Sequence, residues 1–446
     1  MAHLRFALQL ALLVPAAAAQ CPVPLLVYQS PSASVGNTSD PSNKYGIEDG
    51  IVVRRADGSF SMLCAAMYAA PVWVRMRLDV YSSTDALTWT RRRSLRESSG
   101  DFTGKDPHSS SWGPFFVHDP ANDTWALTYI GYRGAPSNQS GWLINYDGIA
   151  YGRYASARGD AGLDSDFGDA AEGFAGDSTL LAPDDFVVTG PWPHVCQGLQ
   201  GTDSFFPFPL SDGTWAAFVG TSHSELPNPH PGQGKWPVSL ATAPAMFGPW
   251  TRYNPSGGPP ADAPCVPLNG GFSENPIVTR RPDNPRAFQV LHDALNAEAK
   301  GFGYSCSEDG LAWEDSTLVP LPFGARTPFG MVAMTPAEVQ RMAPAILQYG
   351  VLNASQIGAA NTTLSWLFYT SCPPPGGDYC IGQASGGWGG CCVGVYWFSA
   401  FLSPSAPTFY LRPLTLLFFP CTLFMVLSTL PPHAESMYTG IVFQSW

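Results

Sequence analysis

The chain has 446 residues, with 45 glycines, 43 prolines and 13% aromatic residues, and only 13% of its residues are charged. This composition is typical of a turn-rich, all-β protein with ample apolar material for a large core. The formal net charge of −12 argues against nucleic acid or an anionic membrane surface as the natural partner, and it leaves neutral or cationic ligands open.

The N-terminus has the layout of a cleavable secretory signal over residues 1–19. Arg5 precedes an apolar stretch, which ends in the small-residue run Ala16–Ala19. We therefore expect a secreted protein whose ten cysteines mostly form disulfides, although spacing alone does not give the partners. The Asn-x-Ser/Thr sequons that would then meet the glycosylation machinery are Asn37, Asn122, Asn138, Asn353 and Asn361.

One short pattern recurs five times along the chain: a small or acidic residue, an apolar run, a polar turn and an aromatic-rich strand. Repetition at intervals of very roughly 55–90 residues is typical of a β-propeller, in which each copy is one blade that cannot bury both of its faces alone. The sequence therefore predicts a five-bladed β-propeller over residues 25–405. The copies begin at Glu48, Gly113, Asp203, Glu274 and Thr327.

Tight turns follow the first strand in three copies. Asp57-Gly58, Asn122-Asp123 and Asp212-Gly213 tolerate the positive φ of a hairpin turn, and aromatic or β-branched residues flank them. We expect each copy to open with a hairpin.

Residues 83–89 and 307–313 share the frame Ser-x-Asp-small-x-x-Trp. In this frame the carboxylate can cap turn amides, and the tryptophan can fill the space between neighbouring blades. We interpret both segments as structural. Further along, Thr335, Pro336 and Glu338 predict the start of a helix with a capping box.

The C-terminal part contains a hydrophobic segment over residues 409–430, which is about long enough to span a bilayer and is followed by a short tail over residues 431–446. A single-pass membrane anchor is one interpretation, and it is the only membrane contact expected. Pro413 and Pro420 interrupt such a helix, and the flanking charges do not favour it. The alternatives are a buried strand pair that closes the propeller ring, or an artefact of the gene model.

Propeller geometry indicates where chemistry could lie. The innermost strand of each blade lines the central channel, so the residues that begin each copy converge on one mouth of it. The acids at these positions are Glu48, Asp49, Asp203 and Glu274. Glycoside hydrolysis needs such carboxylates, one as proton donor and one as base or nucleophile. Each acid could instead cap loop amides.

Four further residues are candidates for substrate binding. Trp112 could stack on a sugar ring, and His223, His292 and Asp293 follow equivalent strands and could bind substrate hydroxyls. Core packing for the tryptophan and ordinary hydrogen bonding for the histidines stay open. We expect no cofactor and no metal ion.

The Asp-Gly hairpins, the segment Gly248-Pro249-Trp250 and the segment Ile47-Glu48-Asp49-Gly50 resemble the five-bladed propeller glycoside hydrolases, the superfamily of arabinanases, xylosidases and invertases. The resemblance covers roughly residues 25 to 400. It implies that Asp49 is the base or nucleophile, with Glu48 as the alternative, and that Asp203 is the proton donor.

The chain departs from that family pattern in two blades. Blade two has Gly113-Pro114 where the resemblance implies an acid, unless Asp119 or Asp106 supplies the charge. Blade three has Asp203 where the family more often has glutamate, so Glu274 or Glu225 could carry the acid role.

The sequence thus predicts a monomeric glycoside hydrolase that acts on poly- or oligosaccharides and is secreted, or anchored with an extracellular propeller. One alternative is a catalytically inactive propeller that binds carbohydrate or protein, which the missing blade-two acid favours. A weaker alternative is a sialidase, suggested by the two Ser-x-Asp frames.

Overall fold

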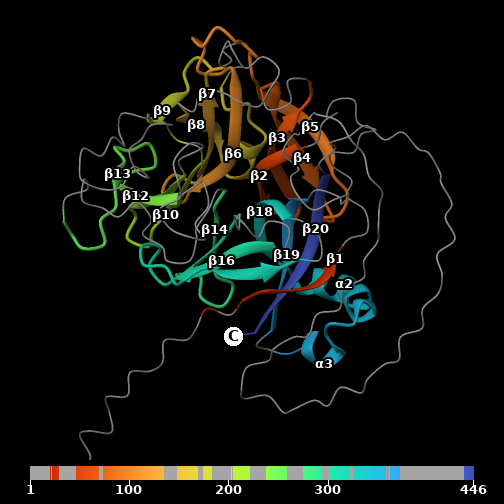
Figure 1. Ribbon diagram of the computed structural model, residues 1–446. Helices are drawn as coiled ribbons and strands as arrows, with labels where there is room; N and C mark the ends of the chain where they lie inside the picture. The colour runs from red at the N-terminus through yellow and green to blue at the C-terminus, as the bar shows by residue number, and fades with distance from the viewer. Residues whose placement is uncertain are drawn as a thin grey trace, which may run out of the picture.

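The computed structural model has an all-β, propeller-like arrangement, which confirms that part of the expected fold class (Figure 1). The signal sequence expected over residues 1–19, the hydrophobic segment 409–430 and the candidates Asp203, His223 and Glu274 lie outside the described residues. The structure describes residues 21, 23–29, 47–69, 74–134, 148–168, 174–182, 202, 204–220, 238–258, 275–293, 301–321, 325–357, 359, 362–371 and 436–445.

The described strands form five four-stranded sheets in which neighbouring strands are antiparallel. Four of these sheets each consist of four consecutive strands. The first sheet contains β2 (Ile47–Arg54), β3 (Phe60–Met67), β4 (Met76–Ser83) and β5 (Thr90–Glu97). The second contains β6 (Ser110–Asp119), β7 (Thr124–Tyr132), β8 (Ile149–Arg158) and β9 (Ser178–Leu181). The third contains β10 (Ser204–Pro209), β11 (Trp215–Gly220), β12 (Val238–Ala243) and β13 (Thr251–Arg252). The fourth contains β14 (Ile277–Arg280), β15 (Phe288–Asp293), β16 (Gly301–Ser307) and β17 (Thr317–Pro320).

The fifth sheet joins the two ends of the chain. Its order is β18 (Ala325–Ala333), β19 (Thr362–Ser371), β20 (Ser436–Ser445) and β1 (Leu25–Gln29). The sequence predicts that residues 431–446 form a tail beyond a propeller ending at 405, whereas the structure places β20 inside this sheet. The run Ile441-Val442-Phe443 suits a strand, and its pairing covers the edge that β19 would otherwise expose.

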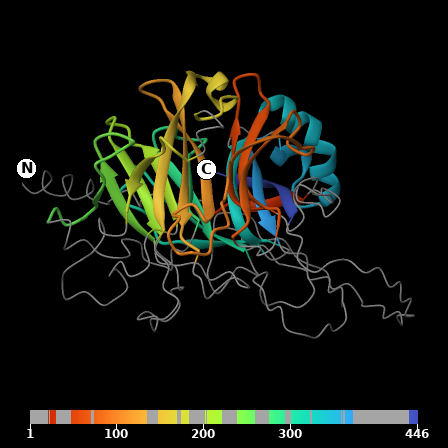
Figure 2. The ribbon, with the colours of Figure 1, turned by 90° about the horizontal axis from the view of Figure 1, so that it is seen from above.

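The first strands of the five sheets surround the centre of the molecule. In order round the ring, β2 contacts β6, β6 contacts β10, β10 contacts β14, β14 contacts β18, and β18 contacts β2. Figure 1 shows these strands gathered around the middle, and Figure 2 shows the sheets standing side by side with helix α2 (Pro336–Tyr349) at the outer edge. The first strand of each copy is therefore the innermost strand.

The predicted hairpin turns are present in the first and third sheets. Gly58 and Gly213 have φ of +86° and +87°, which a residue with a Cβ rarely adopts. The preceding aspartates cap the turns, since Asp57 and Asp212 each accept a hydrogen bond from the backbone N–H two residues later, at 2.9 Å. This confirms the predicted role of the Asp-Gly pairs.

The two Ser-x-Asp frames adopt the same structure. The carboxylate of Asp85 accepts hydrogen bonds from the amides of Leu87 and Thr88, at 2.8 and 2.7 Å. The carboxylate of Asp309 does the same with the amides two and three residues later, both at 2.8 Å. The third position of the turn has a positive φ in both, 66° at Ala86 and 84° at Gly310. Glycine adopts this conformation freely because it has no Cβ, whereas Ala86 is a non-glycine residue held in it by the turn.

The tryptophans that end these frames pack between sheets, as predicted. Trp89 of the first sheet meets Phe368 of the fifth edge-on, with 5.8 Å between ring centroids. Trp313, which follows the third strand of the fourth sheet, lies 5.1 Å from the ring of Phe218 in the third. Each frame therefore fixes its own turn and one junction between neighbouring sheets.

Helices are short in the described part of the chain. They are α1 (Asp160–Leu163), α2 and α3 (Ala354–Ile357). The predicted capping box of α2 is confirmed: the N–H of Glu338 donates to Thr335 Oγ1, and the N–H of Thr335 donates to Glu338 Oε2. Among the described residues, no helix combines the length and apolar character needed to cross a bilayer.

A buried ion pair joins the first and second sheets. Arg96 of β5 donates to both carboxylate oxygens of Asp177, at 2.8 and 3.1 Å, and the two side chains are 1% and 0% exposed. The hydroxyl of Tyr129 also donates to Asp177, at 2.7 Å. Breaking one partner of such a pair leaves an uncompensated buried charge.

We expect Asp177→Asn to lower the free energy of unfolding by about 3–5 kcal/mol, because Arg96 would stay buried without its counter-charge. Asp164→Asn is the matched control: it removes the carboxylate that pairs with Arg55 across the same junction, but Asp164 is 62% exposed. That change should cost about 0–1 kcal/mol. Urea titration measures both, and equal losses in the two variants would contradict the argument.

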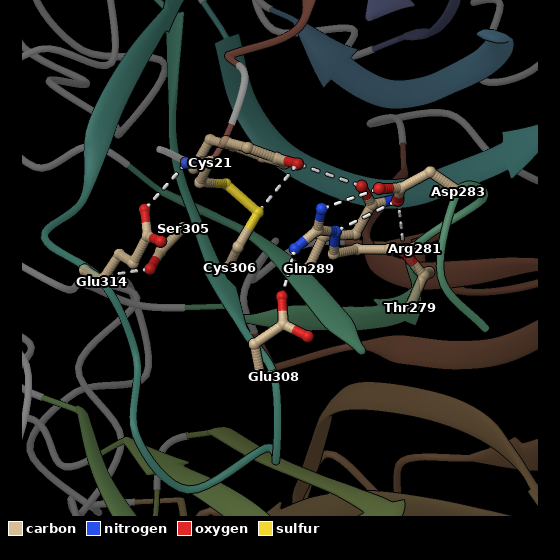
Figure 3. Close-up of a disulfide and its surroundings, with 10 residues drawn as sticks. Cys21, Thr279, Arg281, Asp283, Gln289, Ser305, Cys306, Glu308 and Glu314 are labelled. Atoms are coloured by element: carbon tan, nitrogen blue, oxygen red, sulfur yellow. Dashed lines mark hydrogen bonds and ion pairs between the residues drawn. A yellow bond between two sulfur atoms is a disulfide. The ribbon is translucent and has the colours of Figure 1, made fainter. Parts of the chain in front are cut away.

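A disulfide ties the start of the described chain to the fourth sheet. Cys21, just before β1, bonds to Cys306 of β16 across 285 residues of sequence, and its backbone N–H donates to Glu314 at 3.0 Å (Figure 3). In Figure 3 Glu314 lies on one side of the disulfide, and Arg281 lies on the other between Asp283 and Glu308. Cys64 is a buried free thiol, and burial raises its pKa.

We expect the double variant Cys21→Ser/Cys306→Ser to lose about 2–5 kcal/mol of stability, because the unfolded chain regains the freedom that a long closed loop removes. Glu314→Gln is the control, because it changes only the acceptor of the Cys21 N–H; it should cost at most about 1 kcal/mol. Both free energies come from urea titration. Wild-type stability in the double variant would show that this disulfide does not hold the ring.

Candidate functional site

Asp49 sits at a bulge in the innermost strand of the first sheet. Glu48 pairs with Ala65 and Gly50 with Cys64, so Asp49 is an extra residue between them. Its φ is +42°, a left-handed conformation that a non-glycine residue rarely adopts. Bulges of this kind redirect a side chain, and strained backbone of this kind concentrates at functional sites.

The carboxylate of Asp49 reaches the innermost strand of the second sheet. It is buried, and its Oδ2 accepts a hydrogen bond from the backbone N–H of Gly113 at 3.3 Å. Gly113 has φ of +50° and lies at a second bulge, where two residues of β6 face one residue of β7. The link therefore joins two irregular positions in neighbouring inner strands.

The residues next to Asp49 follow from the same close packing. Glu48 is fully buried, so two adjacent carboxylates lie inside the innermost strand. A Cβ on Gly50 would come within 2.2 Å of the carbonyl oxygen of Leu63 on β3, so only glycine fits there. The segment Glu48-Asp49-Gly50 thus has one residue fixed by packing and two that place carboxyl groups in the interior.

The fourth sheet repeats this arrangement with an amide. Asn275 precedes β14, has φ of +55° and is buried. It donates from Nδ2 to Oδ2 of Asp293 at 3.1 Å, and Asp293 is fully buried at the end of β15. Asn275-Pro276-Ile277-Val278 aligns with Asp49-Gly50-Ile51-Val52. Asn275 is not among the site residues predicted from the sequence, although this alignment and the tolerance of asparagine for left-handed backbone indicate it.

His292 is enclosed within the fourth sheet. Its Nδ1 lies 2.8 Å from the carbonyl oxygen of Asp293 and its Nε2 lies 2.6 Å from Ser316 Oγ. Because a carbonyl only accepts, Nδ1 carries the proton and Nε2 accepts from the serine hydroxyl. Its ring covers Gly303, where a Cβ would come within 1.9 Å of Cε1. This arrangement favours the ordinary hydrogen-bonding role that the sequence left open.

Trp112 lies on β6, next to the bulge. It is half-buried, its indole N–H donates to Ser110 Oγ, and its ring packs against Ala65, Met67 and Met76 of the first sheet. Both roles considered from the sequence, core packing and sugar stacking, fit a ring with one packed and one accessible part.

Hydrogen bonds place the starts of three inner strands at the same end of the ring. The Asp49–Gly113 link joins the starts of β2 and β6. Thr202, just before β10, donates its N–H to Gly148 at 2.8 Å, and Gly148 precedes β8 at the end of the second sheet where β6 begins. Buried polar side chains near the strand starts of the second, third and fifth sheets are Ser110, Ser111, Thr202, Ser204, Thr327 and Thr370.

The second sheet presents no carboxylate from Asp119 at this end. Asp119 ends β6, opposite Thr124, and accepts hydrogen bonds from the N–H of Ala121 and the hydroxyl of Tyr154. Asp106 lies nearer the strand start, where it caps the N–H of His108 at 2.8 Å. Within the part of the chain that the structure describes, no group of three or more His, Cys, Asp or Glu side chains is placed to hold a metal ion.

Glu48 and Asp49 are consecutive residues of β2, and Asn275 bonds to Asp293 in the fourth sheet. Asp203 and Glu274 directly precede the described residues Ser204 and Asn275, but they and His223 lie outside the described residues. Their assignment as acid and substrate-binding residues stays a prediction.

No family model matches the chain, and no curated protein matches its sequence. Solved structures with a similar fold include a family 117 glycoside hydrolase of the marine bacterium Zobellia galactanivorans, at 12% identity over 78% of this chain and 84% of that one, with a TM-score of 0.46. A family-43 subgroup 1 enzyme of Xanthomonas citri complexed with xylotriose matches at 10% identity over 78% and 85%, with a TM-score of 0.39.

A Hadza microbial sialidase matches at 10% identity over 77% of this chain and 55% of that one, with a TM-score of 0.42. The solved structures with a similar fold thus include glycoside hydrolases, the group that the sequence resembles. All three TM-scores lie below 0.5, so the site must be argued from its own geometry.

His292 supplies a pH dependence with a defined sign. Burial lowers its pKa from 6.5 to about 4, against a smaller effect of the hydrogen bond to Asp293. The unfolded chain therefore takes up this proton at a higher pH than the folded chain does. The neutral imidazole therefore contributes to the free energy of unfolding at pH values above the unfolded-state pKa of 6.5. This contribution, about 3 kcal/mol, is lost as the pH falls from there to the folded-state pKa of about 4.

We expect wild-type protein to lose more stability than His292→Gln between about pH 7 and pH 4.5, because only the wild type has this group to protonate. Urea titration at both pH values measures the two losses. Parallel loss in both proteins would show that the imidazole does not stay neutral in the fold.

Proposed function

We propose that this protein is a glycoside hydrolase, and that its five sheets are the five blades of a propeller with the reaction centre at the end of the ring where the inner strands begin. The observation that carries the proposal is the Asp49 carboxylate, which is held on a left-handed bulge against the Gly113 N–H of the neighbouring inner strand. Strained backbone that aims a buried acid between two strands has a clear use in catalysis.

The proposed chemistry needs two carboxyl groups with different protonation states. Asp49 would act as base or nucleophile on the sugar carbon, with Glu48 beside it as the alternative. The proton donor would come from the third or fourth blade, where Asp203 and Glu274 precede Ser204 and Asn275. A separation of about 6.5–9.5 Å between the two carboxyl groups would give inversion, and about 5–5.5 Å would give retention.

Asn275 and Asp293 are suited to substrate hydroxyls in this scheme. Their hydrogen bond uses Nδ2 of Asn275 and Oδ2 of Asp293. The amide oxygen Oδ1 of Asn275 is a second polar atom of this pair and can accept a hydrogen bond. A carbohydrate has many hydroxyl donors and would be positioned by such groups. The substrate is therefore proposed to be a poly- or oligosaccharide.

Secretion and a monomeric state are both part of the proposal. The signal pattern over residues 1–19 supports secretion, and so does the Cys21–Cys306 disulfide, because disulfides persist in oxidising compartments. The alternative of a membrane anchor rests on residues 409–430 alone.

A catalytically inactive propeller that binds carbohydrate is the second candidate. Glu48 is 0% and Asp49 5% exposed, and the second sheet presents Ser110, Ser111 and Gly113 where the resemblance implies an acid. Burial of this degree would suit acids that hold the ring together. The sialidase alternative stays the weaker one: both Ser-x-Asp frames that suggest it serve turns and the packing of Trp89 and Trp313.

We expect Asp49→Asn to lower kcat on 4-nitrophenyl glycosides by about 10²- to 10⁴-fold, because the amide can neither take a proton nor attack the sugar. Asp119→Asn is the matched control at the opposite end of β6 and should retain wild-type turnover. Initial rates across a panel of glycosides measure both.

Two results would decide against this proposal. An Asp49→Asn enzyme with wild-type turnover removes Asp49 from the reaction. Wild-type protein that turns over no glycoside of the panel, but binds oligosaccharides in calorimetry, would replace hydrolysis with the binding function.

A further inference from the structure

Apolar side chains are exposed where helix α2 ends. Leu347, Tyr349 and Val351 are 40%, 45% and 40% exposed, and they lie within five residues of one another around Gly350, whose φ of +83° turns the chain out of the helix. Among the described residues the other large hydrophobic side chains exposed to this degree are Val23 and Leu318, far away in sequence. Exposed apolar side chains that gather in one place mark surface that is stabilised when another group covers it.

A glycosylation sequon directly follows this group. Asn353 is exposed, two residues after Val351, and the sequon continues through Ala354 to Ser355. Asn353 begins helix α3: its Oδ1 accepts hydrogen bonds from the N–H of Gln356 at 3.0 Å and from Ser355 Oγ at 2.6 Å. Both bonds use the oxygen, so a substituent on Nδ2 would leave this cap intact.

The sequon at Asn122 differs in this respect. Asn122 lies in the turn between β6 and β7, and its Nδ2 donates to Asp119 Oδ2 at 2.9 Å. Asp119 is a buried carboxylate that also holds the N–H of Ala121 and the hydroxyl of Tyr154. The nitrogen of Asn122 is thus part of the turn, whereas the cap at Asn353 is made by the amide oxygen.

We propose that Asn353 carries an N-linked glycan, and that this glycan covers Leu347, Tyr349 and Val351. In the modification, Nδ2 forms a bond to C1 of the first sugar while the bond from C1 to the diphosphate of a lipid-linked oligosaccharide breaks. The amide loses one proton, and the lipid diphosphate leaves. No redox partner is needed.

Position and chemistry make the glycan a suitable cover. The attachment site lies two to six residues from the three apolar side chains, on the same protruding edge of the molecule, where α2 and α3 are adjacent (Figure 1). Sugar rings present C–H faces that pack against aromatic rings, and Tyr349 offers such a ring. The glycan would thus remove apolar surface from water without a protein partner.

The test uses the full chain, expressed in a eukaryotic cell line with its own N-terminus. Enzymatic removal of N-glycans converts the modified asparagine to aspartate, so peptide mass spectrometry of the secreted protein should find Asp at position 353. The exposed patch is probed with the dye anilinonaphthalene sulfonate, whose fluorescence rises when it binds apolar surface.

Matched variants separate the glycan from the helix cap. Asn353→Asp keeps an oxygen that caps α3 but has no acceptor nitrogen, and Ser355→Ala destroys the sequon while Asn353 stays. Both should lose the glycan and gain dye fluorescence. Ser355→Thr keeps the sequon and should match the wild type, and adding Leu347→Lys and Tyr349→Lys to Asn353→Asp should abolish the gain.

Unmodified Asn353 in the wild-type protein would overturn the proposal, whether the chain is secreted or stays in the cell. Equal dye fluorescence with and without the glycan would overturn its covering role. Asn122→Gln serves as a comparison, because loss of that sequon should leave the dye signal at the wild-type level. None of these outcomes depends on glycosidase activity.

Discussion

The hydrogen bond from the Gly113 N–H to the Asp49 carboxylate is the interaction on which the site depends. It joins the innermost strands of two sheets at bulges where both residues have left-handed backbone. A regular β2 would turn the Asp49 side chain to the other face of the strand, because side chains alternate along a strand. The bulge therefore gives an acid to the junction, and glycine at 113 supplies a donor without steric cost.

The proposed site also needs a closed ring, because its acids come from inner strands that are distant in sequence. The two ends of the chain supply the closure: β1 and β20 share the fifth sheet with β18 and β19. The Cys21–Cys306 disulfide then fixes the segment before β1 to the fourth sheet. Between sheets, the Arg96–Asp177 pair lies at the junction of the first and second sheets, and the rings of Trp89 and Trp313 pack at two other junctions.

Local patterns in the sequence were enough to predict several of these features. Asp-Gly turns, the frames ending in Trp89 and Trp313, and the capping box at Thr335 each depend on residues within about one turn of one another, where spacing and chemistry leave few structures. Contacts between distant segments could not be obtained this way. The pairing of Asn275 with Asp293, the bond from Gly113 to Asp49 and the insertion of β20 depend on how strands meet in the ring. His292 illustrates the same limit in part, since one partner is the carbonyl of its neighbour Asp293 but the other, Ser316, lies 24 residues away.

Chemical rescue tests the central claim most directly. Asp49→Gly keeps the left-handed backbone at this position, since glycine adopts it freely, and removes only the carboxylate. The account predicts that this variant loses turnover of an aryl glycoside and that added formate, a small carboxylate, restores part of it. Wild-type turnover in Asp49→Gly, or a folded variant whose lost activity formate does not restore, would contradict the view that the Asp49 carboxylate takes part in the reaction.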